Sequence, residues 1–101
     1  MNIQQLQQQS SELLDKIDSK HPDKKHDAET TFIHLIEELG EVARQLFNEK
    51  IGRDKIDKEN LSEEIADCTI LLSKLSSNYN INLEQAIIDK LTKLKIRFNI
   101  D

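Results

Sequence analysis

Four acidic side chains form two pairs whose spacing suits metal-dependent chemistry. Glu38 and Glu41 lie three positions apart, and Glu64 and Asp67 repeat this spacing later in the chain. Residues three apart in an α-helix are neighbours on one side of it, so each pair presents two carboxylates together. If the two helices face one another, four carboxylates converge, and their mutual repulsion calls for a bound cation.

An all-oxygen ligand set of this kind favours a hard divalent ion, Mg²⁺ or alternatively Mn²⁺. Mg²⁺ held by carboxylates keeps several waters and takes further ligands from substrate phosphates. The chemistry that fits is therefore attack of a metal-activated water on a phosphoryl centre. Asp67 carries most of this prediction, because residues 65–72 are apolar on almost every side and we expect that segment to be buried. Glu38 and Glu41 alone would equally suit a solvated helix face.

The histidines and the cysteine offer no competing catalytic set. A di-iron helical site would need Glu-x-x-His pairs, and His34 and Glu37 stand in the opposite order. His34 shares the carboxylate face and is a candidate substrate contact. His21 and His26 fall in a charged loop and are predicted to be surface residues. Cys68 lies on an apolar helix face and is expected to behave as a small buried hydrophobe.

These side chains need helices to position them, and apolar residues recur at intervals of three and four along most of the chain. The expected helices run over Ile3–Ser19, Ala28–Glu49, a segment starting near Asn60 or one turn earlier and ending at Asn78, and Asn82–Arg97. The second has an apolar stripe, interpreted as its core face: Phe32, Leu35, Ile36, Leu39, Val42, Ala43, Leu46 and Phe47. We expect an all-α fold, a four-helix bundle forming a single domain over residues 1–101.

Composition restricts the partners. Hydrophobic residues make up 37% of the chain, which is a lean core for a monomer, and the apolar Ala66 and Ile70 lie away from the core stripe of their helix. We therefore expect a homodimer or homotetramer. The net charge of −5 argues against binding nucleic acid, and no apolar run is long enough for a membrane span. The N-terminus does not have the pattern of a signal peptide, so a cytoplasmic location is expected.

Three segments resemble the MazG-like all-α nucleoside triphosphate pyrophosphohydrolases. They are HLIEELGEVARQL from His34, LSEEIADCTILLSKL from Leu61, and NLEQAIIDKLTKLKIRF from Asn82. The family pattern is EExxE followed, after a variable gap, by ExxD, and the resemblance covers roughly the last two thirds of the chain. It implies hydrolysis between the α and β phosphates of a nucleotide, giving a nucleoside monophosphate and pyrophosphate.

The resemblance also implies roles for particular residues. The metal ligands would be Glu38, Glu41, Glu64 and Asp67, with Glu37 assisting the attacking water. Lys90 and Arg97 match basic positions of the last helix that could hold phosphates, with Lys93 a further candidate on the same side. The family often has Asn where this chain has Leu94. Two alternatives stay open: a related enzyme acting on phosphoribosyl-ATP, and a helical interaction module without catalytic activity.

Overall fold

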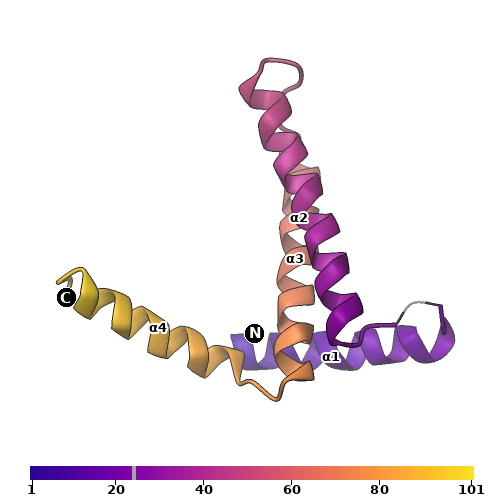
Figure 1. The fold of residues 1–101 in the computed structure, drawn as a ribbon, viewed down its shortest axis with the longest axis vertical. Helices are drawn as coiled ribbons and strands as arrows, with labels where there is room; N and C mark the ends of the chain where they lie inside the picture. The colour runs from indigo at the N-terminus through magenta and orange to yellow at the C-terminus, as the bar shows by residue number, and fades with distance from the viewer. Residues whose placement is uncertain (24) are drawn as a thin grey trace.

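The computed structural model describes residues 1–23 and 25–101, and the described chain is built from four helices (Figure 1). They are α1 (Ile3–Lys20), α2 (Ala28–Lys50), α3 (Lys58–Asn78) and α4 (Leu83–Arg97). The expected all-α class is confirmed. Of the two starts considered for the third helix, the earlier one is observed, because the Asp57 side chain caps it by accepting the backbone N–H groups of Glu59 and Asn60.

The helices make an open arrangement. Antiparallel α2 and α3 lie side by side as a long hairpin, α1 crosses the foot of this hairpin, and α4 leads away from it (Figure 1). The Cα radius of gyration is 16.2 Å, against about 13 Å for a compact domain of this length. None of the helices in the described part of the chain is long and apolar enough to cross a membrane.

The α2–α3 contact is a seam with coiled-coil spacing and a partly polar composition. The buried and half-buried positions that mark the seam on α2 recur at three and four: Ala28, Thr31, Leu35, Glu38, Val42 and Gln45. On α3 they are Leu61, Glu64, Cys68, Leu71 and Leu75. Leu35, Cys68 and Leu71 form the buried cluster, with Val42 packed against it. Cys68 is thus a buried hydrophobe, as expected, and the same seam carries two carboxylates.

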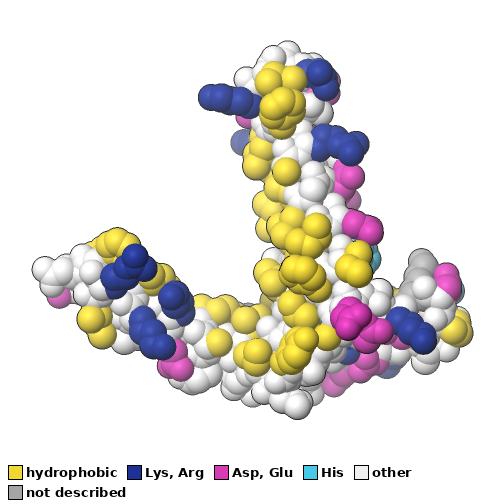
Figure 2. Space-filling model, viewed as in Figure 1, with side chains coloured by type: hydrophobic (Ala, Val, Ile, Leu, Met, Phe, Trp, Pro, Cys, Tyr) yellow, Lys and Arg dark blue, Asp and Glu magenta, His cyan; other side chains and the backbone are white. Residues whose placement is uncertain are grey.

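The interpretation of the α2 apolar stripe as the core of the chain was wrong. Of its members Leu35 is buried, whereas Phe32, Ile36, Leu39, Leu46 and Phe47 are between 45% and 59% exposed. Figure 2 shows hydrophobic side chains along the α2–α3 hairpin and on α4. The reason is the rotation of α2 about its axis, which turns the side bearing Thr31, Glu38 and Gln45 toward α3.

Helix α1 holds the foot of the hairpin through polar contacts. The Lys74 ammonium, on the buried side of α3, donates to Asp15 Oδ1 at 2.8 Å and to Ser11 Oγ at 3.4 Å. The Gln7 amide donates to the carbonyl oxygen of Ile81 at 2.7 Å and accepts the backbone N–H of Leu83 at 3.0 Å. Gln7 therefore fixes the start of α4 against α1.

Lys74→Ala is expected to lower the free energy of unfolding by about 1–3 kcal/mol, because it removes a buried aliphatic stem together with the contacts to α1. Asp15→Asn keeps an acceptor oxygen at an exposed position, and its expected cost is below about 1 kcal/mol. Urea denaturation followed by circular dichroism measures both. Equal losses in the two variants would contradict the assigned role of the Lys74 stem.

Candidate metal centre

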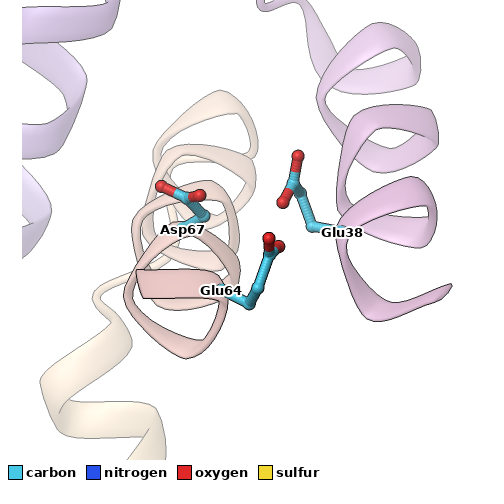
Figure 3. A group of neighbouring side chains, drawn as sticks. All are labelled: Glu38, Glu64 and Asp67. Carbon is cyan, nitrogen blue, oxygen red and sulfur yellow. The ribbon is translucent and has the colours of Figure 1, made fainter. Parts of the chain in front are cut away.

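Three of the four acids meet at the middle of the α2–α3 seam. Glu38, Glu64 and Asp67 each offer a carboxylate oxygen, and these oxygens lie within 4.8 Å of one another. Glu38 comes from α2 and the other two from α3. Glu38 and Glu64 point toward each other across the gap between the helices, and Asp67 lies beside them on α3 (Figure 3). The seam spacing causes this, because it places Glu38 and Glu64 in facing positions.

This crowding is electrostatically unfavourable without a counter-charge. The hydrogen bond to Glu38, partial burial and the negative charge of Glu38 all raise the pKa of Glu64. Burial, and then the nearby charges of Glu38, Glu64 and Asp67, raise the pKa of the Cys68 thiol. Oε2 of Glu64 is buried and has no hydrogen-bond partner within the described residues.

These observations fit a divalent cation. A buried carboxylate oxygen without a donor, facing two further carboxylates, is the environment that a positive ion stabilises. The donors are all oxygen, which suits Mg²⁺ or Mn²⁺ and does not suit soft metals. Glu38, Glu64 and Asp67 are thus the side chains able to hold the ion.

The structure differs from the sequence-based expectation at Glu41 and at Asp67. Glu41 is exposed and is not part of the cluster, because it lies a further turn along α2 and roughly 60° around its axis from Glu38. Asp67 is in the cluster, but its expected burial was wrong. The apolar segment around it is covered on one side, and Ile65 and Leu72 are 52% and 48% exposed.

Of two further candidates, His34 contacts the cluster, and Glu37 lines a separate cavity. His34 Nε2 is 3.4 Å from Oε1 of Glu38, one turn away on the same helix, and so limits the orientation of that carboxylate. Glu37 is exposed and lines a cavity of 380 Å³ together with Lys25, His26 and His34.

The basic residues of α4 are not brought to the cluster within this chain. Lys90, Lys93 and Arg97 are exposed. Helix α4 packs against α1 and extends away from the hairpin that carries the carboxylates (Figure 1).

The prediction that His26 is a surface residue was wrong. Its side chain is 8% exposed, and Asp18 of α1 accepts both its backbone N–H and its ring Nδ1. His26 also lines a cavity of 160 Å³ that Glu38 and Asp67 border. No local spacing signals this contact, because it depends on the chain folding back so that the loop before α2 meets the end of α1.

Fold and site define a small all-helical protein with facing carboxylates at a helix–helix seam. The sequence profile of the MazG nucleotide pyrophosphohydrolase domain matches residues 26–99. The chain belongs to this family, and the resemblance seen in its motifs is confirmed. No curated protein and no solved structure gave a significant match. The family supports nucleotide pyrophosphohydrolase activity in general and is typically metal-dependent.

In metal-free protein, Glu64→Gln is expected to raise the melting temperature by a few degrees at pH 8 and to leave it unchanged at pH 4. The folded-state pKa of Glu64 is raised above its ordinary 4.5. Wild-type stability therefore falls as pH rises from about 4.5 through that folded-state pKa, and the variant lacks this loss. Thermal unfolding in EDTA at both pH values measures the difference.

The exposed neighbour Glu63→Gln is the matched control and should behave as wild type. Millimolar Mg²⁺ or Mn²⁺ should raise the melting temperature of wild type more than that of Glu64→Gln. An equal metal-induced shift in both proteins would show that Glu64 is not part of the ion site.

Proposed function

We propose that this protein is an Mg²⁺-dependent enzyme, with Mn²⁺ able to substitute, that hydrolyses a nucleoside triphosphate to a nucleoside monophosphate and pyrophosphate. The observation that carries the proposal is the convergence of Glu38, Glu64 and Asp67 in a chain of this family. Removal of non-standard or surplus nucleotides is the physiological role we favour. Because the proposed substrate is a nucleoside triphosphate, we also propose that the protein acts in the cytoplasm.

Each side chain of the site has a proposed task. A hard cation, when bound, neutralises phosphate charge and lowers the pKa of a bound water. Glu38, Glu64 and Asp67 hold that cation, and Glu41 adds a carboxylate from the next turn of α2. His34 restrains Glu38 through the 3.4 Å contact and is near enough to meet substrate. Glu37, on the wall of the 380 Å³ cavity that His34 also lines, accepts a proton from the attacking water.

The two alternatives receive less support. An interaction module without activity would not need a complete EExxE and ExxD set, and this chain retains every acid of the pattern. A site for phosphoribosyl-ATP would use the same carboxylates, and no observation favours that larger substrate. A nucleoside triphosphate is therefore the preferred substrate class.

We further propose that the protein works as a homodimer or a dimer of dimers. Five members of the α2 apolar stripe are about half exposed in one chain, as are Ile88 and Leu91 of α4; the five are Phe32, Ile36, Leu39, Leu46 and Phe47. A monomer rarely leaves so much contiguous apolar surface in water. A second copy also offers a route by which Lys90, Lys93 and Arg97 could reach a carboxylate site, where they would hold substrate phosphates.

Glu38→Gln and Asp67→Asn are each expected to reduce pyrophosphate release by at least about 100-fold, because each removes a charged ligand from the ion site. The assay measures pyrophosphate from a panel of nucleoside triphosphates, with Mg²⁺ and with EDTA. Glu63→Gln is the control and should retain wild-type rates. Full activity in both ligand variants would overturn the site, and an inactive wild type on every nucleotide would overturn the function.

Leu46→Asp is expected to yield monomers, because it puts a charge into the apolar stripe of α2, near the C-terminal end of the stripe. Arg44→Asp, two residues earlier on the same helix but outside the stripe, should keep the wild-type mass. Size-exclusion chromatography with light scattering measures the masses, and circular dichroism checks that helix content is retained. A monomeric wild type at tens of micromolar would contradict the proposed association.

A further inference from the structure

Three hydrogen bonds join His26 to helices α1 and α3. One carboxylate, that of Asp18, accepts the His26 backbone N–H at 2.8 Å and the ring Nδ1–H at 2.5 Å. The Asn78 side chain, at the end of α3, donates to the His26 carbonyl oxygen at 3.4 Å. His26, two residues before the first residue of α2, is thereby fixed against both α1 and α3.

The Asp18 contact determines what the His26 ring can offer to a ligand. An ionised carboxylate can only accept hydrogen bonds, so Nδ1 carries the proton. With the proton on Nδ1, Nε2 of the neutral ring is an acceptor. The hydrogen bond from Nδ1 to Asp18 therefore sets the tautomer of the ring. Asp18 thus prepares His26 to receive a hydrogen bond from an N–H or O–H group.

The cavity beside this ring adjoins the carboxylate cluster. Its volume is 160 Å³, and it is bordered by Glu38 and Asp67 of the cluster. The other walls include the aliphatic side chains of Leu14, Ile70 and Leu71, from α1 and α3. Typical small-molecule pockets measure roughly 300–1,000 Å³. This cavity is smaller than that range, so it has room for only part of a nucleotide. Its aliphatic walls suit a ring system.

We propose that His26 is a substrate-binding residue whose Nε2 accepts a hydrogen bond from the nucleoside part of the substrate, and that Asp18 is the positioning residue that sets its tautomer. The proposal rests on the proposed function, because the triphosphate must lie at the carboxylates for the nucleoside to enter this cavity. The donor on the ligand is a base N–H or a sugar O–H, which share this chemistry.

The sharpest test is His26→Asn. The Asn amide can still donate to Asp18 from a position close to that of Nδ1, but it has nothing in place of Nε2. The expected result is a roughly tenfold higher KM for the best nucleoside triphosphate, with kcat unchanged, as for loss of one binding hydrogen bond. The melting temperature and the affinity for Mn²⁺ alone, measured by electron paramagnetic resonance, should stay at wild-type values.

Asp18→Asn tests the positioning role. An amide that keeps its oxygen on the His26 backbone N–H turns its NH₂ toward Nδ1, which favours the opposite tautomer and makes Nε2 a donor. KM should then rise as in His26→Asn, and the double variant should be no worse than either single variant. His21→Asn, an exposed histidine of the same loop, is the matched control and should leave KM unchanged.

The outcomes separate this inference from the proposed function. A wild-type KM in His26→Asn, or a fall in melting temperature that accounts for its defect, overturns the role of His26 while wild-type hydrolysis still supports the function. With 2′,3′-dideoxynucleotides, loss of the difference between wild type and His26→Asn identifies the sugar hydroxyl as donor. A retained difference identifies the base, and either result supports the proposal.

Discussion

The close approach of Glu38 and Glu64 in the α2–α3 seam is the constraint on which the rest of the structure depends. Coiled-coil seams normally fill such positions with apolar side chains, and here two facing positions carry carboxylates. The hydrogen bond between them, partial burial and the negative charge of Glu38 raise the pKa of Glu64. One oxygen of Glu64 is buried without a hydrogen-bond partner among the described residues. The packing of Leu35, Cys68 and Leu71 on one side of the pair keeps the helices together despite this cost. The fold therefore maintains a negative site that a cation or a proton relieves.

Helix α1 holds the foot of this hairpin and forms part of the wall of the cavity beside the carboxylates. It contacts α3 through the Lys74–Asp15 ion pair, and its last turns hold His26 through Asp18. Leu14 of the same helix lines the cavity next to the carboxylates. Although the family profile begins at residue 26, this cavity would be open on the α1 side if α2 and α3 were its only walls.

Much of this could be predicted from sequence, and the exceptions have one physical cause. Helix existence and type follow from apolar spacing, so the end of the second helix and the start of the fourth were each placed to within one residue. The convergence of Glu38, Glu64 and Asp67 followed from their spacing. Periodicity gives the direction of an apolar face but not the element that covers it. The exposed stripe of α2, the exposure of Asp67 and the burial of His26 therefore could not be deduced from one helix at a time.

The exposed stripe and the carboxylate site are consequences of the same rotation of α2. If α2 turned Ile36, Leu39 and Phe47 toward α3, the core of one chain would grow, but Glu38 would move into solvent and lose Glu64 as its neighbour. The observed rotation keeps the carboxylates together and leaves the apolar surface uncovered. Under the proposed association, a second copy covers that surface. Folding within the chain then forms the carboxylate cluster, and contacts between chains supply the missing hydrophobic burial. Weakening the association would then lower the free energy of unfolding. It would lower activity only if α4 of the second copy contributes side chains to the site.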